Sequence, residues 1–123
     1  MFYRVCVLCL LIAGFAAYPM GPSSSIDGLV TSDIAGTIPN ARIGVDKVTG
    51  GFHRETTTNS SGYYLVDDLS PGAYSVWAEV RGLGCIIYPH LAVPPGERIH
   101  QNFHFVRAKR YPGNCEPVQK RSE

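Results

Sequence analysis

The residue types in this chain that could hold a metal ion or move a proton are histidine and the carboxylates, and their spacing argues against both roles. His53 and Glu55 are separated by one residue, whereas a zinc peptidase needs a His-x-x-Glu pair so that two ligands on one turn fix the metal. His100 and His104 lie four residues apart. In a strand that spacing separates their Cα atoms by about 13 Å, too far to share one zinc ion. We expect surface histidines and predict no metal site.

Other motifs for catalysis are missing from the sequence. No serine lies in a Gly-x-Ser-x-Gly turn, and no glycine-rich loop leads into a helix to cradle a phosphate. Asp67-Asp68 could ligate calcium, although acidic pairs in turns are usually only solvated. Asn59-Ser60-Ser61 fits the N-glycosylation sequon, which matters only in a eukaryotic secretory pathway and otherwise indicates a hairpin turn. The sequence therefore predicts a protein that is not an enzyme, with no catalytic residues and no cofactor.

The first residues are typical of an export signal. Arg4 precedes an apolar, uncharged run over residues 5–17, and Gly14-Phe15-Ala16 supplies small residues for cleavage after Ala16. The run is too short to span a bilayer, which needs about 20 residues. We predict a signal peptide over 1–16, a short lead over 17–25 and a secreted or periplasmic product without a membrane span. Retention of the segment as an anchor is the alternative.

Charge narrows the class of partner. The chain has 11 Lys+Arg and 10 Asp+Glu, and without Arg4 the remaining 10 basic residues balance the 10 acidic ones. Binding to nucleic acid needs a clustered excess of Lys and Arg, so nucleic acid is not expected as a partner. A protein or a glycan remains, and we expect a monomer.

Two cysteines remain once the predicted signal, with Cys6 and Cys9, is removed. Cys85 and Cys115 are expected to pair in an oxidising compartment, with two free thiols as the alternative. A bridge closing this loop would contribute about 3–4 kcal/mol by chain entropy. It would also tether the polar tail over 107–123.

The rest of the chain has the pattern of an all-β domain over 26–106. No helical periodicity is sustained, and short apolar–polar alternations are separated by Gly, Pro, Asn and Asp. Tyr64, Val66, Leu69 and Tyr74 fall at core spacing. The expected strands cover residues 26–31, 41–46, 52–58, 63–66, 74–80, 85–88, 91–93 and 99–106.

Alternation along 74–80 places Trp77 and Glu79 on the outer face of a sheet. Two explanations compete for this indole. Either the tail held by Cys115 covers the ring, together with Tyr111, or the ring is exposed. An exposed Trp77, flanked by Glu79 and Tyr63, would form a ligand face for a sugar or a partner protein.

The order of several short motifs resembles one family. Gly28-Leu-Val30, Asp33-Ile-Ala-Gly36 and Ala41-Arg-Ile43-Gly-Val45 come first, and Asn59-Ser-Ser-Gly62 and Leu69-Ser-Pro71-Gly72 follow. Together they are similar to the carboxypeptidase regulatory-like domain, over residue 26 to about 106. Gly82-Leu-Gly84-Cys85 departs from the family's usual Gly-Phe turn.

The resemblance implies a seven-stranded Greek-key β-sandwich of the transthyretin (prealbumin) type, related to carbohydrate-binding-like sandwiches. It also implies a non-catalytic module. We therefore expect an exported interaction or structural module, with a carbohydrate-binding module as the alternative. An accessory domain that has lost its partner is a third possibility.

Overall fold

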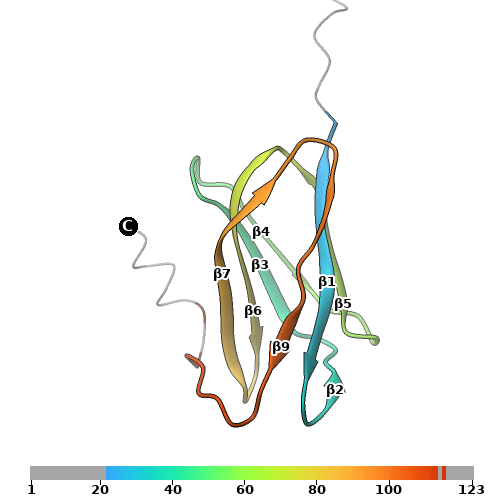
Figure 1. Ribbon diagram of the computed structural model, residues 1–123, viewed down its shortest axis with the longest axis vertical. Coiled ribbons are helices and arrows are strands. Elements are labelled where there is room, and N and C mark those ends of the chain that lie inside the picture. Colours follow the sequence, from blue (N-terminus) through green and yellow to red (C-terminus); the bar gives the residue numbers. More distant parts are fainter. Residues whose placement is uncertain (1–21, 114, 116–123) are drawn as a thin grey trace, which may run out of the picture.

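The computed structural model describes residues 22–113 and 115. The predicted signal peptide and residues 116–123 of the predicted tail lie outside this part of the chain. The described residues form nine strands and no helix (Figure 1), which confirms the all-β class. The strands are β1 (Ser24–Ser32), β2 (Gly36–Thr37), β3 (Arg42–Lys47), β4 (His53–Thr57), β5 (Tyr63–Leu69), β6 (Gly72–Val80), β7 (Gly84–Val93), β8 (Arg98–His100) and β9 (Phe103–Phe105).

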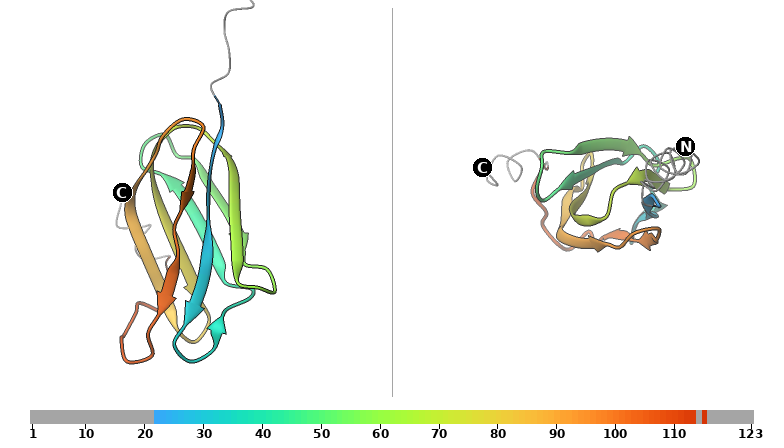
Figure 2. Two further views of the ribbon diagram at one scale, coloured as in Figure 1. Left: turned by 45° about the vertical axis from the view of Figure 1, so that its right-hand side comes forward. Right: turned by 90° about the horizontal axis from the view of Figure 1, so that it is seen from above.

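The strands form two sheets that face each other (Figure 2). One has the order β4-β3-β6-β7, with antiparallel neighbours throughout. In the other, β1 is central and is paired along both of its edges. β5 and β2 run antiparallel to β1, whereas β8 and β9 run parallel to it.

The nine strands occupy seven positions across the two sheets. Ile26 pairs with Ile99 and Val30 pairs with Phe103, so the same sequence offset holds before and after the break between β8 and β9. These two strands are therefore one interrupted strand, where the sequence predicted a continuous one over 99–106. β2 pairs with the same edge of β1 as β5. When β8 and β9 count as one position and β2 and β5 count as another, the nine strands fill the seven positions of the expected sandwich.

The core lies between the sheets, and the predicted core residues are in it. Tyr64, Val66, Leu69 and Tyr74 are all buried. The full set of buried core side chains is Ile26, Val30, Ile38, Ala41, Ile43, Val45, Tyr64, Val66, Leu69, Tyr74, Val76, Ala78, Val93, Phe103 and Phe105.

Some strand limits differ from those expected. β1 begins at Ser24, within the segment predicted to be a short lead, because Ser24 already pairs with Leu69. β5 continues through the expected turn at Asp67-Asp68, with Asp68 in the left-handed region (φ 55°). β7 runs unbroken through Pro89 where two short strands were predicted. Proline is tolerated there because β7 lies at the edge of its sheet.

The break between β8 and β9 lies directly over Gly28. The Gln101 amide donates to the Asp27 carbonyl (2.8 Å), and the Tyr64 hydroxyl donates to the Gln101 carbonyl. A Cβ at position 28 would lie 2.1 Å from the Gln101 oxygen. The backbone at Gln101 can therefore approach β1 this closely only because residue 28 is glycine.

Replacing Gly28 with Ala should destabilise the sandwich. The new methyl group meets backbone that cannot move without breaking the pairing of β1 with β8 and β9, and overpacking of this kind costs about 1–3 kcal/mol or more. For a domain of this size, each kcal/mol lowers Tm by roughly 4–8 °C. Gly113→Ala is the matched control, because a Cβ there meets nothing within 4 Å. Equal Tm values for the two variants, measured by thermal unfolding, would contradict this account.

Candidate functional site

The single tryptophan lies on the outer face of the four-stranded sheet and is nevertheless buried. Trp77 is only 2% exposed, although its neighbours Val76 and Ala78 face the core. Its register partner on β3 is Gly44. A Cβ at Gly44 would lie 2.0 Å from the indole. The ring therefore lies against the β3 backbone, in space that only glycine leaves open.

A disulfide joins Cys85 and Cys115, as the sequence predicted, with their Cα atoms 5.5 Å apart. Trp77 and the two cysteines form a small buried cluster, with Ile87 packed against it. The structure thus agrees with the covered form of Trp77. The position of Tyr111 differs from the prediction. Its ring packs against Phe105, with 5.2 Å between the two ring centroids, rather than on the indole.

Polar contacts fix the indole from the remaining directions. Its Nε1 donates to the Asp46 carboxylate at 3.1 Å, and the Arg42 guanidinium lies 5.4 Å from the ring centroid. Arg42 also pairs with Glu55 (2.7 Å) and Glu79 (2.5 Å). The indole is thus enclosed by protein and ion pairs, and it offers no free ring face to a ligand.

His53 completes this charged cluster. It contacts the Asp46 carboxylate and lies 2.8 Å from Glu55. The hydrogen bond to Asp46, followed by that to Glu55, raises the pKa of His53 above its ordinary value of 6.5. The bond from Arg42, followed by that from His53, lowers the pKa of Glu55. The cluster therefore links β3, β4 and β6 by charge.

The predicted ligand face of Trp77, Tyr63 and Glu79 is not formed. Trp77 is covered and Glu79 is paired with Arg42. Tyr63 belongs to β5 in the other sheet, where its hydroxyl donates to Asp27. Alternation gave the correct face of each strand, but periodicity does not show which sheet a strand joins.

A second cluster, which the sequence analysis missed, centres on Asp27 in β1. Asp27 is only 3% exposed, and its carboxylate accepts a 2.8 Å hydrogen bond from the Tyr63 hydroxyl. His100 contacts it through Nδ1, and Arg98 lies 3.7 Å away. The bond to Asp27 raises the pKa of Tyr63. The parallel pairing of β1 with β8 brings these groups together, and no local sequence signal reveals that pairing.

Apolar side chains lie beside this cluster on the same outer face. Leu29 is 40% exposed and Leu65 is 37% exposed. Leu29 is the register partner of Tyr63, and Leu65 is the register partner of Asp27. We call Leu29, Tyr63 and Leu65 the β1–β5 patch. It presents two aliphatic side chains and one half-buried ring on adjacent, paired strands.

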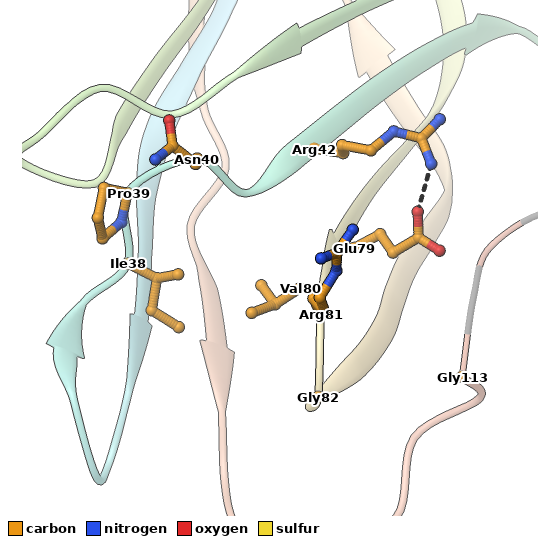
Figure 3. Close-up of a pocket in the computed structure, with 9 residues that line it drawn as sticks. All are labelled: Ile38, Pro39, Asn40, Arg42, Glu79, Val80, Arg81, Gly82 and Gly113. Carbon is orange, nitrogen blue, oxygen red and sulfur yellow. Dashed lines mark hydrogen bonds and ion pairs between the residues drawn. The ribbon is translucent and has the colours of Figure 1, made fainter.

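An open groove of about 810 Å³ lies at one end of the sandwich, between the β2–β3 connection and the end of β6 (Figure 3). The Arg42–Glu79 ion pair lies along it. None of the described residues that line it is aromatic. The lining residues are Ile38, Pro39, Asn40, Arg42, Glu79, Val80, Arg81, Gly82 and Gly113.

Within residues 22–113 and 115, no group of three or more His, Cys, Asp or Glu side chains is placed to hold a metal ion. In the same part of the chain, no helix has the length and apolar character needed to cross a membrane.

Two facing sheets, with the first strand central in one of them and the last strands parallel to it along one edge, define a β-sandwich of the transthyretin-like type. The model of the carboxypeptidase regulatory-like domain matches residues 25–106. The chain belongs to this family. A search of the curated proteins found no match.

Solved structures with this fold come from different kinds of protein. The dioxygenase domain of a dioxygenase–carbohydrate-binding protein fusion from Streptomyces sp. SirexAA-E has a TM-score of 0.51 at 13% identity, covering 73% of this chain and 82% of that one. The Bacillus anthracis TIE protein has a TM-score of 0.58 at 18% identity, covering 69% and 16%. A candidate carbohydrate binding protein from Bacteroides uniformis ATCC 8492 has a TM-score of 0.53 at 18% identity, covering 69% and 42%. At these identities the likeness shows the fold alone.

Removing the tail should uncover Trp77. Deletion of residues 108–123 takes away Cys115, so the emission maximum should move to the red and acrylamide should quench more strongly. Trp77 is the only tryptophan, so the signal comes from this site alone. A Cys85→Ser/Cys115→Ser double variant should shift in the same direction, because no bond then holds residue 115 beside the ring. Unchanged emission after the deletion would show that the tail is not the cover.

The His53 contacts should make stability depend on pH. Because the pKa of His53 is raised on folding, its contribution is complete below pH 6.5 and is lost as pH rises through the folded-state pKa. The side chain is 41% exposed, so the contribution should be only roughly 0.2–1 kcal/mol.

Urea unfolding of the wild type and His53→Gln, followed at several pH values around and above 6.5, measures this contribution. The difference in unfolding free energy should shrink as pH rises. His90→Gln is the matched control, because His90 is exposed on β7 and has no acidic partner among the described residues. A difference between wild type and His53→Gln that is constant with pH would refute the assignment.

Proposed function

We propose that this domain is an exported, non-catalytic interaction module that binds a protein partner through the β1–β5 patch. The observation that carries the proposal is the pair of exposed leucines beside Tyr63 on one sheet face. Contiguous apolar groups rimmed by polar ones are typical of interaction surfaces. Family membership supports the non-catalytic role, and the Cys85–Cys115 bridge supports export, since disulfides persist in oxidising compartments.

The side chains of the patch are preorganised in the unbound protein. Leu29 and Leu65 project from paired strands rather than loops. The Tyr63 ring is held by its hydrogen bond to Asp27, and Asp27 is in turn contacted by His100. A rigid surface loses little conformational entropy on binding. Arg98 and His100, at the edge of the patch, provide a polar rim.

Binding of a glycan is the second candidate, and the groove is the observation that favours it. Asn40, Glu79 and Arg81 offer hydrogen-bonding groups in a concave site. One structure with the same fold is a candidate carbohydrate binding protein. Among the described residues, the groove is lined by no aromatic ring on which a sugar could stack, and Trp77 is enclosed elsewhere. Protein binding is therefore the better supported function.

The two candidates can be separated with matched surface variants. A Leu29→Ser/Leu65→Ser double variant should weaken partner binding by at least about tenfold, because a tenfold loss needs only about 1.4 kcal/mol and truncating a hot-spot side chain at the centre of an interface costs about 2 kcal/mol or more. Val48→Ser is the control, since Val48 is 47% exposed but lies outside the patch. Immobilised domains would be compared by quantitative capture from native extracellular or envelope material, and by a glycan array in parallel.

Partners that bind the wild type and Val48→Ser, but not the double variant, would support the proposal. Equal capture by all three domains would contradict it. Array binding that is lost in an Asn40→Ala/Arg81→Ala variant and kept in the leucine variant would establish the glycan alternative instead.

A further inference from the structure

We propose that Asn59 is an N-glycan acceptor when the chain passes through a eukaryotic secretory pathway. The inference rests on the proposed export, and it concerns a site outside the β1–β5 patch. Asn59-Ser60-Ser61 is a sequon. A sequon alone is a weak signal, so the inference depends on what the fold does with each atom of the Asn59 side chain.

The β4–β5 turn uses the oxygen of the Asn59 amide and leaves its nitrogen available. Oδ1 accepts hydrogen bonds from the backbone amides of Ser61 (2.9 Å) and Tyr63 (3.0 Å). The Asn59 backbone also pairs with Tyr63 and Gly62. Within the described residues, Nδ2 makes no hydrogen bond of its own, and Asn59 is exposed. The sugar attaches to Nδ2, so both turn bonds to Oδ1 can persist in the glycosylated protein.

The transfer step requires these atoms together with an oligosaccharyltransferase and a lipid-pyrophosphate-linked oligosaccharide, both supplied by the secretory compartment, and the transferase takes up the proton that the amide releases. Nδ2 attacks the anomeric carbon of the first sugar, and the new N–C bond replaces the C–O bond to the pyrophosphate. The amide nitrogen loses one proton, and the lipid pyrophosphate leaves with the electron pair. Ser61 supplies the hydroxyl that the sequon requires, and that side chain makes no hydrogen bond within the described residues.

The position of the turn leaves room for a sugar. Ser60 and Ser61 are small and exposed, while Gly62 behind them is packed against Thr37 and Ile38. The turn lies at the end of the sandwich opposite the start of β1 (Figure 1). The Asn40 amide donates to the Thr58 carbonyl (3.0 Å), so a glycan on Asn59 would stand beside the connection that lines the groove.

The test uses the full chain, expressed with its own N-terminal segment in a eukaryotic secretory host and collected from the medium. Intact mass should exceed that of the polypeptide by one N-glycan. Digestion with peptide N-glycosidase should remove the excess and leave aspartate at position 59, located by peptide mapping. Ser61→Ala should abolish the modification. Ser60→Ala, which changes the neighbouring hydroxyl but keeps the sequon, should retain it.

A second arm separates this inference from the export on which it rests. The same chain is delivered by a heterologous signal peptide, so that entry into the pathway no longer depends on residues 1–16. Glycosylation in this arm supports the acceptor site even if the native segment fails to direct secretion. Secreted chain at the bare polypeptide mass in this arm overturns the inference. Made in a bacterial host, where neither chain is glycosylated, Ser61→Ala should unfold at the same temperature as the wild type, which would show that the change acts on the sequon and not on the turn.

Discussion

The parallel pairing of β1 with β8 and β9 is the constraint on which the rest of the sandwich depends. It joins segments separated by 73 residues, and it occupies the edge of β1 that β5 and β2 leave free. Ile26, Val30 and Phe103 are fully buried as a result. Contacts of such long sequence separation form late and slowly, since the loop-closure entropy is lost before the contact is gained. Gly28 is the position at which this pairing is most easily broken.

The two outer faces of the sandwich have opposite character. On the four-stranded sheet, the bridged cysteines and an ion-pair cluster enclose Trp77, the largest side chain in the protein. On the β1 sheet, a buried carboxylate holds Tyr63 in place while two leucines remain in solvent. The outer face of the four-stranded sheet therefore contributes to stability, whereas the outer face of the β1 sheet keeps apolar side chains in contact with solvent. The residue that composition first singles out as a binding group, the lone tryptophan, serves packing instead.

Most of the fold was predictable because its signals are local. Alternation at Ile43, Val45 and Tyr64 identifies strands and their inward faces, and the ordered motifs of residues 26–76 identify the family. The outer faces were less predictable, because their composition depends on which strands are neighbours. Tyr63 and Trp77 have similar outward periodicity yet lie on different sheets. The Asp27 cluster needs the pairing of β1 with β8, and the enclosure of Trp77 needs Gly44 opposite it.

Pro89 in β7 affects whether copies of the molecule can associate through the edges of their sheets. An open sheet edge is a template for further strands and for aggregation. At β7, Pro89 has no amide hydrogen to offer, and the Cys85 amide already donates to the Pro112 carbonyl at 2.8 Å. The opposite edge, β4, carries charged side chains at His53, Arg54 and Glu55. Both edges of the four-stranded sheet are thereby poor templates, which favours a domain whose copies stay apart at high concentration.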